Sequence, residues 1–267
     1  MLKFFSIASG SSGNCAFLTD GVTNILIDAG VSARKITAAL ATNELRLNDI
    51  LYVLVTHDHS DHVHSLVTLY EKYGIKIITN KITANKLAES LPNFPKKAIK
   101  GVYTPGTAFR IGNIRISTFP VSHDADCCNG FRFTGRTGES IGFCTDLGFV
   151  DEQVTQALSG AGLVVMESNY DEKMLLDGVY PQQLKRRIRS NAGHLCNRDC
   201  AVALKTLATL GTRYFALAHL SANNNTPETA LACANGELDD PAVNVKVLPR
   251  DGAGPVYILE RSEIWSA

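Results

Sequence analysis

Residues 57–62 read His-Asp-His-Ser-Asp-His, and four of these six side chains commonly bind metal ions in proteins. Imidazole nitrogens suit zinc and its first-row relatives, and an added carboxylate favours the metals used in hydrolysis. An H-x-H-x-D-H pattern is expected by chance in only about 3 in 10,000 chains of this composition. We therefore interpret the hexapeptide as a metal-binding motif rather than as a solvated run of polar residues.

The spacing within this motif predicts two metal positions. Side chains alternate along an extended segment, so His57 and His59 point to the same side of the chain. Asp61 and His62 enter the following turn, where they can face a second position. Hydrolases with two metals hold the ions about 3.5–4 Å apart in one cleft.

Two metals need more ligands than one hexapeptide supplies, and three further candidates each follow an apolar strand. His123 follows residues 116–122, Asp146 follows residues 141–145 and His219 follows residues 214–218. Strand-end loops hold side chains firmly while leaving them open to solvent. We therefore expect these three side chains to meet the hexapeptide along one edge of the fold.

Short strands alternate with helical patterns along the whole chain. The period-2 runs predict strands at 4–8, 16–19, 24–28, 50–56, 76–79, 115–119, 131–134, 141–145, 163–167, 214–219, 243–248 and 256–259. Helical periodicity appears at 33–41, 63–73, 82–89, 181–191, 198–209 and 227–235, with Asn80 and Asn197 as candidate caps and Pro181 and Pro227 in first turns. This alternation predicts an α/β protein in which two packed sheets are covered by helices, a four-layer αββα sandwich.

Bulk composition agrees with one globular domain spanning residues 1–267. Hydrophobic residues make up 45% of the chain, and 26 basic residues balance 26 acidic ones, so attraction of nucleic acid by net charge is not expected. The N-terminus lacks a signal-peptide pattern, and the longest apolar run, residues 50–55, is too short to span a bilayer. With 7 cysteines at irregular spacing, the composition predicts a cytoplasmic protein without a membrane partner.

The order of these motifs resembles the metallo-β-lactamase superfamily, over almost the whole chain. The runs 5–14 (FSIASGSSGN), 26–30 (LIDAG), 167–169 (ESN), 193–195 (GHL) and 219–221 (HLS) are similar to the YycJ/WalJ branch of that superfamily. Members of this branch are DNA-processing metallohydrolases with 5′-to-3′ exonuclease activity. The resemblance implies the metallo-β-lactamase fold and DNA as the substrate.

The resemblance also implies a ligand set of seven residues. His57, His59 and His123 would hold the first metal, and Asp61, His62 and His219 would hold the second. Asp146 would bridge the two ions, while Asp28 would support the histidine loop from behind. The expected cofactors are two divalent ions, zinc or manganese with iron as a further option, and no organic cofactor.

The implied reaction is attack on a phosphodiester by a hydroxide that bridges the two metals. Asp61 could also aim that water, and His194, in a Gly-flanked loop before a helix, is the candidate acid for the leaving group. A solvated His194 is the alternative. Candidate substrate contacts are Ser12 and Asn14 in the Ser-Gly turn, Asn169, and Lys185 with Arg189 on one face of a basic helix, which could equally be a solvated surface.

Three positions depart from the family pattern, namely Ser65, Tyr170 and Cys196. None of them is a predicted ligand, so they bear on rate and substrate choice rather than on metal binding. Two other functions fit the same motifs. One is a small-molecule hydrolase acting on a thioester, lactone, lactam or cyclic phosphodiester, and the other is a non-catalytic metal-stabilised scaffold. The sequence carries no signal for an oligomeric state.

Overall fold

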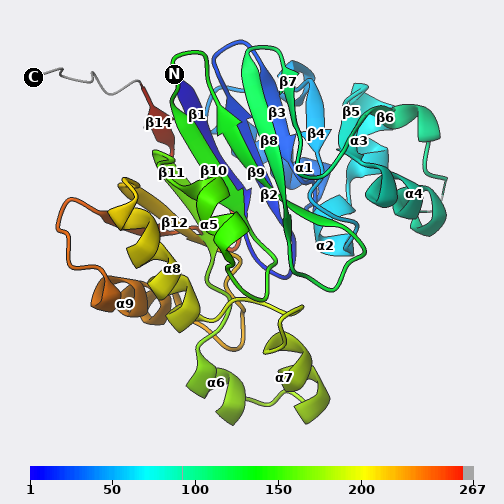
Figure 1. The fold of residues 1–267 in the computed structure, drawn as a ribbon. Helices are drawn as coiled ribbons and strands as arrows, with labels where there is room; N and C mark the ends of the chain where they lie inside the picture. Colours follow the sequence, from blue (N-terminus) through cyan, green and yellow to red (C-terminus); the bar gives the residue numbers. More distant parts are fainter. Residues whose placement is uncertain (92, 261–267) are drawn as a thin grey trace, which may run out of the picture.

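A computed structural model describes residues 1–91 and 93–260, and in it two seven-stranded sheets pack face to face (Figure 1). The first sheet contains, in spatial order, β14 (Tyr257–Leu259), β1 (Leu2–Ala8), β2 (Cys15–Thr19), β3 (Asn24–Ile27), β4 (Tyr52–Leu54), β5 (Lys76–Asn80) and β6 (Ile99–Tyr103). The second contains β13 (Asn244–Val247), β12 (Tyr214–Ala218), β11 (Leu163–Glu167), β10 (Ser140–Cys144), β9 (Cys128–Thr134), β8 (Ile114–Val121) and β7 (Ala108–Ile111).

Helices cover the outer faces of both sheets. The first sheet packs against α1 (Ala33–Ala41), α2 (Ser60–Val63), α3 (Leu66–Tyr73) and α4 (Lys81–Ser90), and the second against α5 (Glu152–Leu158), α8 (Asn197–Thr209) and α9 (Pro227–Glu237). Two further helices, α6 (Glu172–Asp177) and α7 (Gln182–Ile188), lie together below the sheets in the view of Figure 1. Short 3₁₀ turns occupy Leu47–Asp49 and Lys96–Ala98. The predicted four-layer αββα sandwich is therefore confirmed.

The central strands are buried on both faces, which explains their apolar sequences. In β11, Leu163 and Val165 face the other sheet, whereas Val164 and Met166 pack under the outer helices. Side chains alternate across a strand, so both faces of β11 need apolar residues when both are covered. The result is three stacked apolar layers, one between the sheets and one beneath each set of helices.

The predictions missed α2 and the two 3₁₀ turns, which have 3 or 4 residues each, and also two strands and two helices. Strands β6 and β7 lie at sheet edges, where alternate residues are exposed and the apolar signal is weak. Helices α5 and α6 have 7 and 6 residues, too few for a clear helical period. The predicted domain runs to residue 267, and residues 261–267 lie outside the described part of the chain.

Three predictions of local helix geometry were wrong. The predicted helix 63–73 is interrupted at Ser65, because the Ser65 hydroxyl donates to the Val31 carbonyl at 2.5 Å and its N–H donates to the Ala29 carbonyl. Cys196, not Asn197, caps α8. Pro181 lies one position before the first turn of α7, without a side-chain cap hydrogen bond. Asn80, by contrast, caps α4 as predicted, accepting from the Thr83 N–H.

Parallel strands deliver the polar side chains to one end of the sandwich. Strands β3, β4 and β5 are parallel in the first sheet, as are β10, β11 and β12 in the second. Directly beyond these strands, Asp28, Asp146 and His219 adopt left-handed backbone conformations with φ of 58°, 57° and 57°. Non-glycine residues rarely take this conformation, and it is maintained only where the surroundings enforce it.

A glycine braces the loop that carries the metal-binding motif. Gly30 donates to the Asn14 carbonyl at 2.8 Å, and Asn14 donates to the Asp61 carbonyl at 2.8 Å. The space beside the Gly30 Cα is filled by the Asp61 carbonyl, so any β-carbon there would collide with the motif. The close approach of these two backbones therefore requires glycine.

Gly30→Ala should destabilise the metal-free protein by about 1–3 kcal/mol, because the added methyl group must displace the Asp61 backbone. Thermal unfolding followed by circular dichroism would measure the effect, and the matched control is Gly236→Ala on α9. Nothing lies within 4 Å of a β-carbon at Gly236, and alanine is the better helix former, so that variant should be at least as stable as wild type. Equal melting temperatures for wild type and Gly30→Ala would contradict the role assigned to Gly30.

Candidate metal centre

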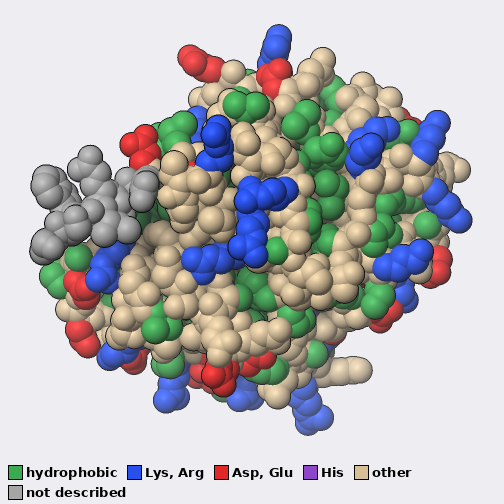
Figure 2. Space-filling view, turned by 45° about the horizontal axis from the view of Figure 1, so that its top comes forward, with side chains coloured by type: hydrophobic (Ala, Val, Ile, Leu, Met, Phe, Trp, Pro, Cys, Tyr) green, Lys and Arg blue, Asp and Glu red, His purple; other side chains and the backbone are tan. Residues whose placement is uncertain are grey.

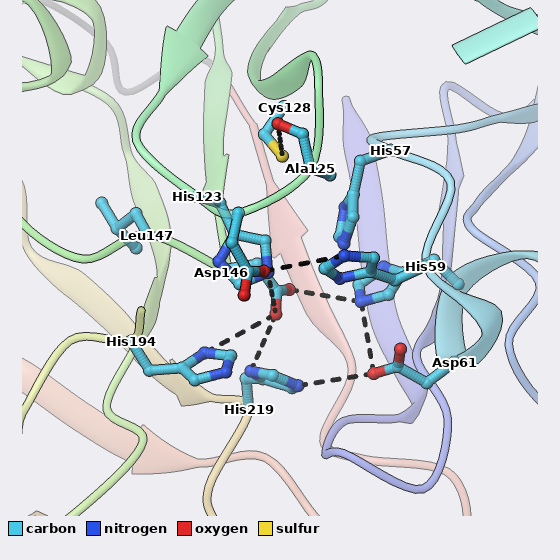
Figure 3. A network of polar contacts seen from close by, with 12 residues as sticks. His57, His59, Asp61, His123, Ala125, Cys128, Asp146, Leu147, His194 and His219 are labelled. Atoms are coloured by element: carbon cyan, nitrogen blue, oxygen red, sulfur yellow. Dashed lines mark hydrogen bonds and ion pairs between the residues drawn. The ribbon is translucent and has the colours of Figure 1, made fainter. Parts of the chain in front are cut away.

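The seven predicted ligands converge between the ends of the two sheets (Figure 3). Ligand atoms of His57, His59 and His123 all lie within 4.8 Å of one another, as do those of Asp61, His62 and His219. A third group at the same spacing joins Asp146 to one histidine from each set, His57 and His62. The structure thus brings together two three-residue sets with a carboxylate between them.

Asp146 occupies the position expected of a bridging carboxylate. Its Oδ2 lies 3.3 Å from the His62 Nε2 atom, and its Oδ1 lies 3.9 Å from the His123 Nε2 atom. These two histidines belong to different predicted sets. One carboxylate therefore faces both candidate metal positions.

Three buried atoms at the centre of the cluster lack a hydrogen-bond partner, namely His57 Nε2, His219 Nε2 and Asp146 Oδ2. The three residues are at most 2% exposed. An unsatisfied buried polar atom costs free energy, and native structures leave very few of them. Two nitrogens and one oxygen that all face the same space match the donor preferences of divalent first-row metals, so the residues present fit such ions.

Hydrogen bonds to the Nδ1 atoms turn the Nε2 atoms toward the centre. His62 Nδ1 lies 2.8 Å from the Asp28 carboxylate, and His123 Nδ1 lies 2.9 Å from the Gly193 carbonyl, which can only accept. His57 Nδ1 lies 2.9 Å from the Thr56 hydroxyl. Each bond favours the proton on Nδ1 of the neutral imidazole and leaves Nε2 unprotonated, which is how residues behind a metal site orient imidazoles.

Asp28 lies behind the histidine loop, against the His62 ring. The carboxylate is 1% exposed and accepts from the Thr56 N–H at 2.8 Å and the Thr56 hydroxyl at 2.9 Å. Since it also contacts His62 Nδ1, this one side chain ties the loop after β4 to His62, a predicted ligand. Burial raises the pKa of Asp28, and these contacts oppose that rise.

The charges of the cluster are strongly coupled. Burial lowers the pKa of His57 well below its ordinary value, which keeps this imidazole neutral. Burial alone would raise the pKa of Asp146, but His219 and His62 hold it well below the usual range. Burial lowers the pKa of His219, yet Asp146, Asp61 and Glu167 outweigh it and raise the pKa to about 10. Without metal, the carboxylates therefore attract protons to the positions that a cation would take.

Glu167 is a functional candidate that the sequence reasoning missed. One oxygen of this fully buried carboxylate lies 2.8 Å from both His194 Nδ1 and His219 Nδ1. The other oxygen accepts a hydrogen bond from the Leu147 N–H at 2.8 Å. Glu167 thus orients a predicted ligand and the predicted acid together. The available signal was its place at the end of β11, in the same strand-end position as the other candidates.

His194 lies at the mouth of the centre, in the loop before α8. Its side chain is 20% exposed, and its Nδ1 atom lies 3.8 Å from Asp146 Oδ1. The imidazole centroid is 5.1 Å from that of His123 and 5.3 Å from that of His219. His194 therefore borders both sets of ligands while remaining open to solvent.

Three of the predicted substrate residues come from the loops around the centre. Asn14 is buried, and its amide nitrogen lies 3.2 Å from Asp61 Oδ2 and 3.0 Å from His62 Nε2. Asn169 is also buried and donates to the His219 carbonyl at 2.8 Å, so it positions the backbone of a predicted ligand. Ser12 is exposed in the turn between β1 and β2.

The prediction that Lys185 and Arg189 share a DNA-facing surface was wrong. Lys185 is 5% exposed, and its ammonium donates to the Leu176 carbonyl at 2.6 Å, which ties α7 to α6. Arg189 is exposed. Because α7 packs against α6 along the side that carries Lys185, only Arg189 of this pair is open to a partner.

The departures from the family pattern fall in structural contacts. Tyr170 and Cys196 are buried beside each other and form an isolated parallel bridge, and the Tyr170 carbonyl accepts from Asn197. Ser65 connects the start of α3 to the loop after β3. All three residues therefore help to place the loops around the centre, without belonging to the ligand groups.

One face of the molecule differs in character from the centre. The face shown in Figure 2 presents lysine, arginine, aspartate and glutamate side chains among hydrophobic ones, and no histidine is visible on it. A cavity of about 430 Å³ is lined in part by Leu51, Lys100 and Phe109. It lies near the start of β4, whereas the metal-binding motif follows the end of that strand. Within residues 1–91 and 93–260, no helix has the length and apolar character needed to cross a membrane.

Comparison with known proteins agrees with this geometry. Residues 23–220 match the family model of the Beta-lactamase superfamily domain. The chain is 36% identical over 244 residues to Exodeoxyribonuclease YycJ of Bacillus anthracis, covering 91% of this chain and 92% of that protein. It is also 36% identical to Exodeoxyribonuclease WalJ of Streptococcus pneumoniae, with 85% of each chain covered. The metallo-β-lactamase fold protein YhfI of Bacillus subtilis superposes with a TM-score of 0.73 at 16% identity, covering 96% and 98% of the two chains, which shows a shared fold. The chain therefore belongs to the metallo-β-lactamase superfamily.

Proposed function

We propose that this chain is a two-metal phosphodiesterase that degrades DNA from an end. We also propose that residues 1–267 form a single domain. The observation that carries the proposal is the pair of ligand sets joined by Asp146, with buried His57 and His219 nitrogens that lack partners. Identity of 36% over 91% of the chain to a protein named an exodeoxyribonuclease supports DNA as the substrate class. We assign the 5′-to-3′ direction of degradation from the sequence resemblance.

The two sets divide the work of holding the ions. His57, His59 and His123 would hold the first, Asp61, His62 and His219 the second, and Asp146 both. Bound divalent cations, zinc or manganese with iron as a further option, would lower the pKa of a water molecule and stabilise the negative charge that develops on phosphorus. Asp146 would neutralise part of the positive charge of both ions, because its two oxygens face the two ligand sets.

Two side chains act directly on the reacting groups in this proposal. Asp61 is 24% exposed at the side chain, so one of its oxygens can accept a hydrogen bond from the attacking water. His194 donates from Nδ1 to Glu167, which leaves Nε2 to pass a proton to the leaving oxygen. Glu167 stabilises the positive imidazole before the transfer, because its carboxylate lies 2.8 Å away.

We also propose a cytoplasmic location. All seven cysteines are free thiols, including buried Cys15, Cys144 and Cys200. Free thiols persist in reducing compartments, whereas exported proteins commonly pair theirs.

The function can be tested on DNA duplexes labelled at either the 5′ or the 3′ end. Chelator-treated protein should leave both intact, and added Mn²⁺ or Zn²⁺ should restore cleavage. A 5′-to-3′ exonuclease releases the 5′ label at once as a small product, while the 3′-labelled strand shortens progressively. Intact DNA in the presence of protein with two bound metals would contradict the proposal, and hydrolysis of a thioester or lactone by the same sample would establish the small-molecule alternative.

Asp146→Ala should abolish cleavage and reduce the metal content below two ions per chain, because both positions lose their shared carboxylate. The loss of activity should exceed about 100-fold, the upper end of what a residue behind the ligands contributes. Asp126→Ala is the control, since this aspartate pairs with Lys86 at the surface. Elemental analysis that finds two metals in Asp146→Ala would remove the bridging assignment.

His194→Ala should retain both metals and lower kcat by about 100- to 10,000-fold, the range for loss of general acid catalysis. The control is His64→Ala, because His64 is exposed and outside the ligand groups. Single-turnover cleavage and metal content should be measured on the same preparations. Loss of a metal from His194→Ala would identify this residue as a ligand instead.

A further inference from the structure

Asp124 places a carboxylate oxygen beside the first ligand set. Its Oδ1 atom lies 3.4 Å from His123 Nε2 and 3.6 Å from His59 Nε2. Both nitrogens belong to the set proposed for the first metal. The Asp124 side chain is 26% exposed, so it lies on the solvent side of that set, opposite the buried His57.

These separations are those of atoms that share a metal. Ligand bonds of about 2.0–2.2 Å in a five-coordinate site place neighbouring donor atoms about 2.8–3.8 Å apart. The predicted ligands of the centre show the same spacing, with 3.3 Å between His62 Nε2 and Asp146 Oδ2 and 3.6 Å between His62 Nε2 and Asp61 Oδ2. The distances from Asp124 Oδ1 to His59 Nε2 and His123 Nε2 therefore match those between the predicted ligand oxygens and His62 Nε2.

An arginine holds Asp124 in this orientation. Arg187 Nε, on α7, donates to Asp124 Oδ2 at 2.5 Å, which leaves Oδ1 directed at the histidines. Charge-assisted bonds from guanidinium to carboxylate are short and directional. Since 63 residues separate the two partners, the contact couples α7 to the loop after β8.

The charge balance of the two positions favours the same assignment. The second set contains its own carboxylate, Asp61, whereas the first set consists of three imidazoles and shares only Asp146. Asp124 would give the first position a carboxylate of its own. An oxygen ligand added to imidazoles makes a site harder and more favourable to manganese relative to zinc.

We propose that Asp124 Oδ1 completes the ligand set of the first metal position, that Arg187 orients it, and that the pair raises the affinity of this position for Mn²⁺ relative to Zn²⁺. The inference rests on the two-metal centre of the proposed function.

Metal binding to the full chain tests the role of Asp124 and Arg187 without a nuclease assay. Titrations of chelator-treated protein with Mn²⁺ and with Zn²⁺ would give the stoichiometry and the dissociation constants. Asp124→Asn should weaken Mn²⁺ binding at one of the two positions by about 10- to 100-fold, with a smaller change for Zn²⁺. Arg187→Ala should change the same constant in the same direction by less, because the carboxylate remains. The matched control, Arg186→Ala, alters an exposed neighbour on α7 and should bind as wild type.

A spectroscopic readout separates ligation from a structural role. The visible absorption of the Co²⁺-loaded protein reports coordination number, so loss of one ligand in Asp124→Asn should intensify the bands, and Arg186→Ala should leave them unchanged. Thermal unfolding of the metal-free variants should match wild type, because Asp124 and Arg187 are partly exposed. Wild-type Mn²⁺ affinity and Co²⁺ spectra in Asp124→Asn would overturn this inference alone, whereas wild-type protein that binds fewer than two ions would overturn the proposed function as well.

Discussion

The burial of one carboxylate charge determines how the centre is constructed. Asp146 is 2% exposed and carries its charge between two sets of imidazoles, with no water-facing side to relieve it. An isolated ionised carboxylate is very costly in such an environment unless cations or donors surround it. The imidazoles around Asp146 lower this cost, and each of them in turn needs an acceptor behind it. Asp28, Glu167 and the Gly193 carbonyl supply those acceptors.

Part of the free-energy cost of this arrangement is strain in the backbone. Asp28, Asp146 and His219 all leave their strands through left-handed conformations that side chains other than glycine rarely adopt. Gly30 permits the closest approach of two loops at the same place. Hydrogen bonds from several loops fix these conformations, which is consistent with a site whose geometry is set before any ligand arrives.

Sequence reasoning singled out the predicted ligands, which the structure brings together, because their signals are local. A dense His/Asp hexapeptide, and single His or Asp residues directly after apolar strands, can be recognised without knowing the fold. The ties between distant segments could not be recognised in this way. Glu167 contacts His194 and His219, which are 27 and 52 residues away in the chain. Lys185 donates to a carbonyl of α6, a helix too short to predict. Edge strands β6 and β7 escaped prediction for a related reason, since half of their residues face solvent.

The ligand groups draw on both sheets of the sandwich. His57, His59, Asp61 and His62 follow β4 in the first sheet, whereas His123, Asp146 and His219 follow β8, β10 and β12 in the second. Ions bound among them would act as non-covalent cross-links between the two sheets, whose shared interior is an apolar layer. Their binding free energy would then add to the cohesion of the sandwich, by about 2.7 kcal/mol at a free ion concentration 100 times the dissociation constant. Supply of metal would thereby govern how long the folded chain survives as well as what it can cleave.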